Sequence, residues 1–451
     1  MLISNLKTLE ELLNPVKAYN LNRFKPIEGF SIDSRVIKKG EAFVAIKGKH
    51  YDGRDFIQEA VSRGAGAVIA QEYIDIKSKP PFFIVNNTYS SLEALAVYIR
   101  QKKNPIVCAV TGSVGKTTTK EMLSFLLEPH FKVLKNKKTE NNLLGLVKTI
   151  FSLKDERIAV LELGTSSKGE IELLSRISKP DIGVITFIKP VHLEGLGNLK
   201  GILEEKTSIF KSNRMMIAVL NRDDSFLAKV KGPAKTYFFG RNKDSDIFSR
   251  LVKKEKTILT FLIQGKYKLR LPSYLEGFIT NYLAAITAAR ILDIKVEESV
   301  ERMNDFYNFA PMRMQMSEIG NFLILNDAYN ANPYSFERAL ESLKNYSFRK
   351  IAVIGDMLEL GEKSAYYHKQ LAFKIAKGNF DYCLSFGKHT QCLRDKLKEL
   401  GHKKAFHFET HQAIADFINR KQQAAGLNKK YLIFLKGSRS MELEKVIEYL
   451  K

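Results

Sequence analysis

The segment 111–117, Thr-Gly-Ser-Val-Gly-Lys-Thr, contains the residue types that bind nucleotide phosphates in a loop. Gly112 and Gly115 would let backbone N–H groups turn inward, toward an anion. Lys116 has the length and charge to reach the terminal phosphates, and the hydroxyl of Thr117 is a suitable magnesium ligand. The chemistry indicated is therefore binding of a nucleoside triphosphate with magnesium. The alternative is a glycine turn that precedes a surface lysine.

The flanking residues predict the elements that must position this loop. Ile106–Val110 are apolar or small, which predicts a buried parallel strand. Apolar residues recur at helical spacing from Met122 to Leu127, and Pro129 ends that run. The loop thus precedes a helix N-terminus, where backbone N–H groups and the helix dipole favour anions. This context favours a phosphate loop, although Val110 occupies the position of the first glycine in the general G-x-x-x-x-G-K-[ST] pattern.

Two further predicted strands end in residues that suit a magnesium-dependent site. Ile158–Leu163 carries one carboxylate, Glu162, and Ile182–Thr186 runs into a segment that contains His192. Ligands bind outside the carboxyl ends of such strands in an open α/β sheet. A buried carboxylate is costly unless it meets a cation, so we predict that Glu162 is a magnesium ligand. A salt-bridged strand end remains the alternative for Glu162, and an ordinary loop histidine for His192.

Length and composition set the broad class. The chain of 451 residues is too long for one core and suggests about three domains. No segment approaches the ~20 apolar residues of a membrane span, and the first residues do not resemble a signal peptide, so we expect a cytoplasmic enzyme without membrane insertion. Cys108, Cys383 and Cys392 form no C-x-x-C pair, which argues against a disulfide framework or a zinc site.

The formal net charge of +23 is compatible with nucleic acid, a membrane surface or small anionic substrates. The lysines are scattered, and the densest runs, 135–138 and 253–256, are short and interrupted. A solvated lysine-rich surface is the favoured interpretation. Basic residues do not alternate with aromatic ones as in single-strand binders, so no nucleic-acid partner is expected.

The first hundred residues predict a small α/β unit that ends in a helix over Ser90–Arg100, followed by a polar connection at 101–105. Ser34, Arg35 and Lys47 lie next to glycine turns in this unit. Together they could hold a diphosphate, and singly they would be turn and surface residues.

The middle of the chain adds further elements. We predict a helical run at Leu203–Phe210, a strand at Met215–Leu220, a hairpin of Thr257–Ile263 with Lys266–Leu271, and a helix over Asn281–Leu292. Phe309-Ala310-Pro311 then marks a domain boundary.

The last third alternates strands and helices, which predicts a parallel sheet with right-handed crossovers. The strands are Phe322–Leu325, Ile351–Ile354, Tyr382–Phe386, Ala405–Phe408 and Tyr431–Leu435. The helices are near Ser335–Leu343, Ser364–Ala376, Thr390–Leu400, His411–Lys421 and Glu442–Leu450. Polar segments follow three strand ends, at 327–333, 355–361 and 436–439, and suggest a site shared with the neighbouring domain.

The ordered set of motifs resembles the Mur ligase family over essentially the whole chain. The matching segments are Asp33–Arg35, Tyr51–Phe56, Thr111–Thr118, Asn141-Asn142 before Gly145, Glu162–Gly164, His192–Gly195, Lys206 before Ile209-Phe210, Asp327–Pro333, Gly355–Gly361 and Lys436–Arg439. The resemblance implies an α/β fold of three domains: residues 1–103 for a UDP-sugar, a central P-loop domain at 104–311 on a mostly parallel sheet, and a Rossmann-like domain at 312–451 that closes over ATP. It also implies a monomer.

The resemblance further implies roles for individual residues. ATP would contact Gly112, Ser113, Val114, Gly115, Lys116, Thr117, Thr118, Asn281 on the adenine side, Arg313 and Asn330. Magnesium would be held or oriented by Thr117, Glu162, His192 and Lys206, with Lys206 carbamylated. Ser34, Arg35 and Lys47 would hold the uridine diphosphate, Asn141 and Asn142 the peptide, and Lys436, Ser438 and Arg439 the incoming dipeptide. Lys116, His192 and Lys206 would serve catalysis.

The implied activity is ATP-dependent addition of D-alanyl-D-alanine to UDP-N-acetylmuramoyl-tripeptide through an acyl phosphate, with release of ADP. The product is the pentapeptide precursor of peptidoglycan, which links the protein to cell-wall biogenesis, cell shape and cell division. The D-N-P-R signature of the ligase that adds a diamino acid is absent, and 386–389 stands in its place. Leu275–Thr280 precedes Asn281 where the family has G-x-H-N, and Leu146-Val147 follows Gly145 where a proline is usual.

Three alternatives remain open. Another Mur-type ligase would add a different amino acid to a UDP-muramoyl peptide. A folylpolyglutamate synthetase would share the loop and metal residues but lack the N-terminal domain. A nucleotide-dependent binding protein without catalytic activity would bind in a salt-sensitive manner and release no phosphate in response to substrate.

Overall fold

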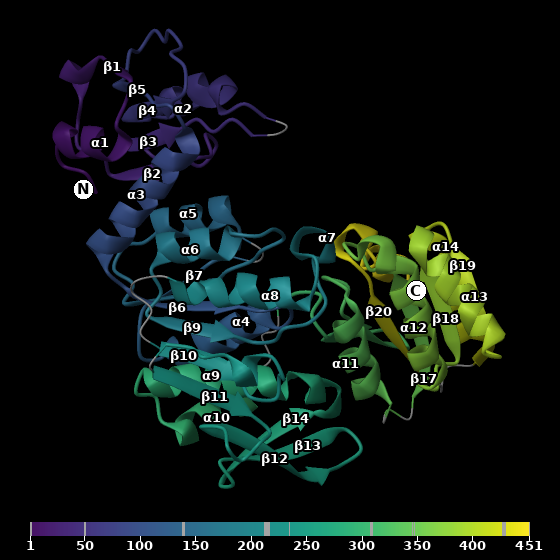
Figure 1. The fold of residues 1–451 in the computed structure, drawn as a ribbon. Helices are drawn as coiled ribbons and strands as arrows, with labels where there is room; N and C mark the ends of the chain where they lie inside the picture. The colour runs from purple at the N-terminus through teal and green to yellow at the C-terminus, as the bar shows by residue number, and fades with distance from the viewer. Residues whose placement is uncertain are drawn as a thin grey trace.

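The computed structural model describes residues 2–48, 51–137, 140–211, 217–233, 235–306, 310–344, 346, 348–425 and 430–450. Within these residues three β-sheets follow one another along the chain, each accompanied by its own helices (Figure 1). We call the parts around them the first, middle and third lobes. The predicted class, α/β with mostly parallel sheets in three parts, is confirmed.

The first lobe has a five-stranded sheet in the order β1-β5-β4-β3-β2, in which only β1 is antiparallel to its neighbour. Its elements are β1 (Lys17–Tyr19), β2 (Gly29–Ser31), β3 (Glu41–Val44), β4 (Ala67–Ala70), β5 (Phe82–Ile84), α1 (Leu6–Leu13), α2 (Ile57–Ser62) and α3 (Thr88–Lys103).

Helix α3 leads from the first lobe into the middle lobe and is longer than predicted. It continues through residues 101–103, which we expected in the connection, and ends at Asn104 in the left-handed conformation (φ 47°). Arg100 is fully buried at the junction, where its Nε donates to the Ser178 carbonyl at 2.7 Å and its Nη2 lies 3.2 Å from Asp181. This buried guanidinium ties α3 to the middle lobe.

The middle lobe has a nine-stranded sheet in the order β14-β13-β12-β11-β10-β9-β6-β8-β7. The strands are β6 (Ile106–Thr111), β7 (Val133–Lys135), β8 (Ile158–Glu162), β9 (Ile182–Ile185), β10 (Ile217–Asn221), β11 (Lys235–Gly240), β12 (Ile247–Lys254), β13 (Ile258–Ile263) and β14 (Tyr267–Pro272). The helices are α4 (Lys116–Leu127), α5 (Leu143–Phe151), α6 (Glu170–Ser178), α7 (Leu193–Leu196), α8 (Leu199–Thr207), α9 (Ile279–Ile291) and α10 (Val296–Asn304).

The predicted hairpin is present as β13 and β14, but β12 adds a third antiparallel strand that we did not predict. The first two residues of the predicted strand 215–220 lie outside the described residues, and β10 begins at Ile217. Phe309 of the predicted boundary is also outside them.

The third lobe has a six-stranded sheet in the order β15-β16-β20-β17-β18-β19. Its elements are β15 (Gln315–Ile319), β16 (Phe322–Asn326), β17 (Arg349–Gly355), β18 (Tyr382–Phe386), β19 (Ala405–Phe408), β20 (Tyr431–Lys436), α11 (Pro333–Leu343), α12 (Ser364–Ala376), α13 (Gln391–Glu399), α14 (His411–Ala425) and α15 (Lys445–Glu448). All five predicted strands are present and parallel to one another, and β15 is an additional edge strand that pairs antiparallel with β16.

The predicted helix at Glu442–Leu450 is wrong, because only the short α15 forms there. Glu442 takes the left-handed conformation (φ 46°), which interrupts the helix before it begins. Leu443, Val446 and Leu450 are buried at spacings that mimic a helix but serve to cover the sheet.

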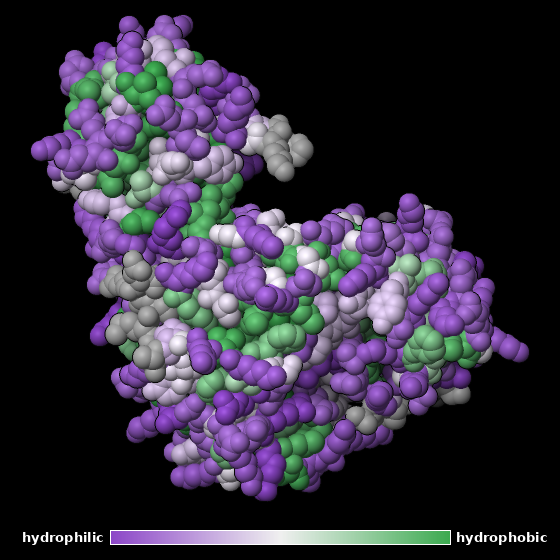
Figure 2. Space-filling model, viewed as in Figure 1, coloured by the Kyte–Doolittle hydropathy of each residue, from purple (hydrophilic) through white to green (hydrophobic). Residues whose placement is uncertain are grey.

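Figure 1 shows the first and third lobes as two arms on the middle lobe, and Figure 2 shows a hollow between these arms. None of the helices in the described residues is both long and apolar enough to span a bilayer.

Candidate active site

Three adjacent parallel strands of the middle lobe bring the predicted phosphate and metal residues to one edge of the sheet. Strand β6 lies between β8 and β9, with Val110 opposite Glu162 and Thr111 opposite Ile185. The phosphate loop therefore begins beside Glu162, and the segment that follows β9 and contains His192 leaves from the same edge.

The phosphate loop has backbone angles that require glycine. Gly112 has φ 144° and Gly115 has φ 82°, and a Cβ added at Gly115 would lie 2.3 Å from Nδ2 of Asn281. Helix α4 begins at Lys116, whose Nζ donates to the Gly112 carbonyl at 3.0 Å. Burial lowers the pKa of Lys116, although the nearby Glu162 carboxylate opposes that shift.

Hydrogen bonds to Thr186, Lys189 and Asn281 brace the loop. The Ser113 hydroxyl donates to the Lys189 carbonyl at 2.9 Å, and the Thr186 hydroxyl donates to the Val114 carbonyl at 2.5 Å. Nδ2 of Asn281 donates to the Gly115 carbonyl at 3.1 Å and to the Thr119 hydroxyl at 2.9 Å. The two donors of Asn281 thus support the loop, and its carbonyl oxygen remains to contact a ligand.

Thr117 and Glu162, the two oxygen-bearing residues predicted to bind magnesium, lie in direct contact. The Thr117 hydroxyl donates to Oε2 of Glu162 at 2.6 Å, and Asn141 Nδ2 donates to Oε1 at 2.8 Å. Glu162 is only 1% exposed. In the described part of the chain no group of three or more His, Cys, Asp or Glu side chains is placed so that it could hold a metal ion. The hydroxyl and carboxylate fit magnesium, which commonly binds one or two carboxylates together with substrate phosphates.

Asn136 and Lys120 support this pair, and the sequence analysis missed both. The Asn136 amide accepts from the Glu162 N–H at 2.8 Å and donates to the Glu162 carbonyl at 2.9 Å, while Lys120 Nζ donates to the Asn136 carbonyl at 2.6 Å. We had placed Asn136 in a solvated lysine run, but it is 1% exposed. The one feature of the sequence that could have indicated a role for Asn136 was its position directly after β7, at the sheet edge where the site lies. Lys138 of that run lies outside the described residues.

Lys206 is a fully buried lysine on α8. Burial, reinforced by the charge of Lys116, lowers its pKa well below the ordinary lysine value. The neutral amine is therefore strongly favoured relative to an exposed lysine. A neutral buried amine is the form that can react with carbon dioxide.

His192 meets the third lobe. It follows β9, adopts the left-handed conformation (φ 51°), and its Nδ1 lies 2.5 Å from Oε2 of Glu359. Glu359 belongs to the polar segment after β17 that the sequence singled out, but the residue itself was not predicted as part of the site. Contact with His192 holds the pKa of Glu359 below its ordinary value.

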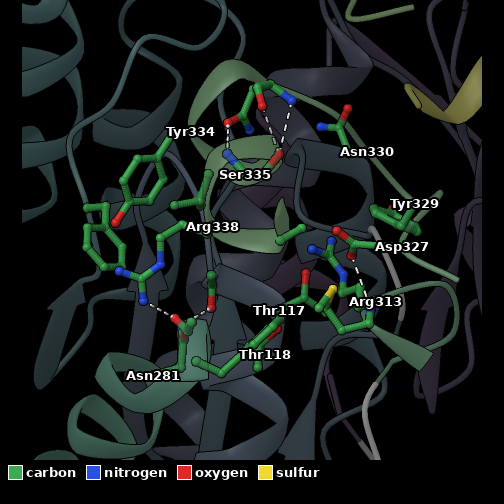
Figure 3. Close-up of a pocket in the computed structure, with 18 of the residues that line it drawn as sticks. Thr117, Thr118, Asn281, Arg313, Asp327, Tyr329, Asn330, Tyr334, Ser335 and Arg338 are labelled. Atoms are coloured by element: carbon green, nitrogen blue, oxygen red, sulfur yellow. Dashed lines mark hydrogen bonds between the residues drawn. The ribbon is translucent and has the colours of Figure 1, made fainter. Parts of the chain in front are cut away.

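A pocket opens between the phosphate loop and the third lobe (Figure 3). Its space is about 910 Å³ when the open solvent at its mouth is included. Side chains of the third lobe surround the space above the phosphate loop, among them Arg313, Asp327, Tyr329, Asn330, Tyr334, Arg338 and Lys436. The middle lobe contributes Ser113, Val114, Gly115, Lys116, Thr117, Thr118, Phe187, Phe278 and Asn281.

The third-lobe residues come from the edge predicted for them. Strands β16, β20 and β17 are adjacent and parallel, so the three polar segments that follow them lie side by side. The Arg313 guanidinium lies 4.2 Å from the ring centroid of Tyr329, and its buried Nε has no hydrogen-bond partner among the residues that the structure describes. Lys436 is buried, pairs with Asp327 and donates to the Asn330 carbonyl at 3.1 Å.

Ser438 and Arg439 make internal contacts beside this pocket. The Ser438 hydroxyl accepts from the Leu358 N–H at 3.0 Å, and Arg439 pairs with Glu444 at 2.5 Å. Asn142 caps α5, since its carbonyl oxygen accepts from the Gly145 N–H at 3.0 Å.

The predicted diphosphate residues lie in the first lobe, after the parallel strands β2 and β3. Lys47 is exposed. Arg35 is also exposed but pairs with Asp33 at 2.7 Å. Ser34 is buried and donates to the Glu59 carboxylate at 2.6 Å. These residues share a sheet edge but lie in a different lobe from the phosphate loop (Figure 1).

Comparison with known proteins connects this geometry to one family. Residues 26–110 match the family model "Mur ligase family, catalytic domain", residues 110–289 the "Mur ligase middle domain", and residues 312–439 the "Mur ligase, glutamate ligase domain".

Relatives match along the whole length. The UDP-N-acetylmuramoyl-tripeptide–D-alanyl-D-alanine ligase of Rickettsia prowazekii is 33% identical, over 92% of this chain and 94% of its own. The ligase of the same name from Bacillus subtilis is 30% identical, over 100% of this chain and 99% of its own.

Solved structures agree with these relatives. A crystal structure of MurF from Acinetobacter baumannii superposes with a TM-score of 0.88 at 26% identity, covering 99% of this chain and 98% of its own. MurF from Thermotoga maritima, solved in complex with ADP, has a TM-score of 0.83 at 30% identity, covering 95% and 97%. The chain belongs to the Mur ligase family.

Proposed function

We propose that this protein is an ATP-dependent, ADP-forming ligase that joins D-alanyl-D-alanine to UDP-N-acetylmuramoyl-tripeptide. The observation that supports this most strongly is the Thr117–Glu162 pair at the head of a phosphate loop, facing a pocket that the third lobe completes. The full-length relatives named for this reaction give the substrate class.

ATP would lie between the middle and third lobes. Its phosphates would accept hydrogen bonds from the backbone N–H groups of Gly112 to Thr118 and from the ammonium of Lys116, at the N-terminus of α4. Asn281 would contact the adenine through its remaining carbonyl oxygen, and Arg313 the phosphates or ribose. Asn330 would approach the nucleotide from the exposed side of the pocket.

Magnesium would be held by Thr117 and Glu162, the two oxygen ligands in contact at the loop, with His192 orienting this site. Lys206 would provide a further carboxylate for a second ion after carbamylation, a reaction favoured by its lowered pKa. Bound there, the metal supplies charge neutralisation for phosphoryl transfer.

The acceptor substrate would bridge the first and middle lobes. Ser34, Arg35 and Lys47 would hold its uridine diphosphate at the edge after β2 and β3, with Asn141 and Asn142 near the peptide end. The incoming dipeptide would be guided by Lys436, Ser438 and Arg439 of the third lobe. The hollow in Figure 2 opens between the first and third lobes, where this substrate would meet the dipeptide.

The chemistry requires activation of an unreactive carboxylate. An oxygen of the tripeptide carboxylate attacks the γ-phosphorus of ATP, and the bond to the β-phosphate oxygen breaks, giving an acyl phosphate and ADP. The dipeptide amine then attacks the acyl carbon through a tetrahedral intermediate, loses a proton and expels phosphate. Lys116 stabilises the charge that develops on the transferred group, and closure of the third lobe excludes water.

On this proposal the chain divides functionally at 103/104 and 311/312. The protein acts in the cytoplasm as a monomer and supplies the peptidoglycan precursor needed for wall growth, cell shape and division.

The test is phosphate release with ATP, UDP-N-acetylmuramoyl-tripeptide and D-alanyl-D-alanine, each omitted in turn. We expect release only in the complete mixture, together with a pentapeptide product detected by mass spectrometry. Phosphate release at an unchanged rate when both the acceptor and the dipeptide are omitted would contradict the proposal. Phosphate release when a single amino acid replaces the dipeptide would instead indicate another Mur-type ligase.

A further inference from the structure

The loop after β17, residues 356–361, is held in place by buried side chains of the third lobe. The Met357 N–H donates to Nε2 of His368 at 3.0 Å, and the Leu358 N–H donates to the Ser438 hydroxyl at 3.0 Å. Asp356 is anchored as well, because its carboxylate accepts from the Thr390 N–H at 2.8 Å. Consecutive backbone groups are therefore fixed immediately before Glu359.

His368 is suited to this supporting task. It is fully buried, and its Nδ1 contacts the Ser364 carbonyl at 2.8 Å, which requires the proton on Nδ1 and leaves Nε2 to accept. Burial lowers the pKa of His368, which favours the neutral ring that an accepting Nε2 requires. The ring thus forms a stable support for the loop.

Two residues at the contact between lobes adopt backbone angles that disfavour side chains. Glu359 has φ 61° and His192 has φ 51°. The left-handed conformation is unfavourable for residues other than glycine, and such strain concentrates at functional sites. Gly361 in the same loop also has a left-handed backbone, with φ 54°, and lies against Glu194 of the middle lobe.

The strained pair meets beside the phosphate loop. Oε2 of Glu359 lies 2.5 Å from the buried Nδ1 of His192, a close charge contact that is not aligned as a hydrogen bond, and Nδ1 has no hydrogen-bond partner among the described residues. The carboxylate is also close enough to Lys116 that each charge favours the ionised form of the other. The third lobe therefore delivers a negative charge to the reaction centre of the middle lobe.

We propose that Glu359 is a positioning residue that orients the His192 ring, so that the reaction centre is complete only when the third lobe is docked. This inference rests on the proposed function. With Nδ1 facing Glu359, Nε2 of His192 is the nitrogen left to face the reactants. A carboxylate that fixes the orientation of a functional histidine in this way typically affects activity by about 10–100-fold.

The test compares Glu359→Ala and Glu359→Gln with Glu362→Ala, at an exposed glutamate directly after this loop. We expect Glu359→Ala to lower kcat about 10–100-fold, with little change in KM for ATP, because the phosphate loop is untouched. Glu359→Gln keeps an oxygen that can face Nδ1 and should retain more activity. Glu362→Ala should behave like the wild type.

A second readout does not depend on turnover. In protein labelled with 15N-histidine and assigned through His192→Gln, Glu359→Ala should shift the ring-nitrogen resonances of His192, and Glu362→Ala should not. Wild-type kcat or unshifted resonances in Glu359→Ala would overturn the inference. An inactive wild type with the expected shift would instead contradict the proposed ligase activity.

Discussion

Gly115 offers a quantitative test of how the phosphate loop is built. With φ 82°, an alanine at this position would adopt a left-handed conformation that costs about 1–2 kcal/mol. Its Cβ would also lie 2.3 Å from Asn281 Nδ2, a contact that real structures do not tolerate. Either the loop or the Asn281 amide has to move.

Movement of Asn281 would break its hydrogen bonds to the Gly115 carbonyl and the Thr119 hydroxyl, at about 1 kcal/mol each. Strain and lost bonds together amount to about 3–4 kcal/mol, or roughly 150–700-fold in affinity if they act on the nucleotide complex. We therefore expect Gly115→Ala to weaken binding of ADP with magnesium by this factor in isothermal titration calorimetry.

Gly401→Ala is the matched control. Gly401 has nearly the same backbone angle, φ 84°, but its added Cβ meets no heavy atom within 4 Å. It therefore reproduces the backbone strain without the clash and lies in the third lobe after α13. If the two variants bind ADP with equal affinity, packing of Asn281 against the phosphate loop does not determine the loop conformation that binds the nucleotide.

The remaining predictions concern buried polar groups. Lys206→Ala should lower activity about 100-fold, the upper end of the range for lost metal-site partners. Acetate or formate should restore part of this activity. An unimpaired variant would contradict the proposed role of Lys206 at the metal site. Asn136→Ala leaves Glu162 without its backbone partner and should raise the magnesium concentration for half-maximal ADP binding about tenfold, whereas an unchanged titration would show that the contact is dispensable. Burial raises the pKa of Cys108 and of Cys383 to about 12, so at pH 8 a native thiol titration should detect only half-buried Cys392; rapid modification of all three would contradict their placement.

Much of the site was predictable because its residues follow strand ends. Parallel strands end at a common edge, so the hydrophobic pattern of the strands predicted that Thr117 and Glu162 lie close together. The Thr117 hydroxyl oxygen and Oε2 of Glu162 are 2.6 Å apart. The same reasoning placed Asp327 and Lys436 side by side in the third lobe. Because strands and helices alternate regularly in that lobe, its sheet could also be predicted from the sequence.

What the sequence did not reveal depends on contacts between distant segments. Asn136 follows a short strand among lysines, and only its pairing with the Glu162 backbone shows that it is buried. Glu359 acquires its contact with His192 from the docking of two lobes, which no local pattern encodes. Asn281 was assigned to the adenine, but the structure shows that its amide donors support the phosphate loop.

The central claim is that ATP activates the tripeptide carboxylate as an acyl phosphate, and oxygen transfer tests it most directly. The acceptor is prepared with 18O in its terminal carboxylate, and the inorganic phosphate released during ligation is analysed by mass spectrometry. Because the oxygen that attacks the γ-phosphorus leaves with the phosphate, the account predicts one 18O atom in each phosphate formed. Phosphate without the label, released in step with pentapeptide formation, would contradict it.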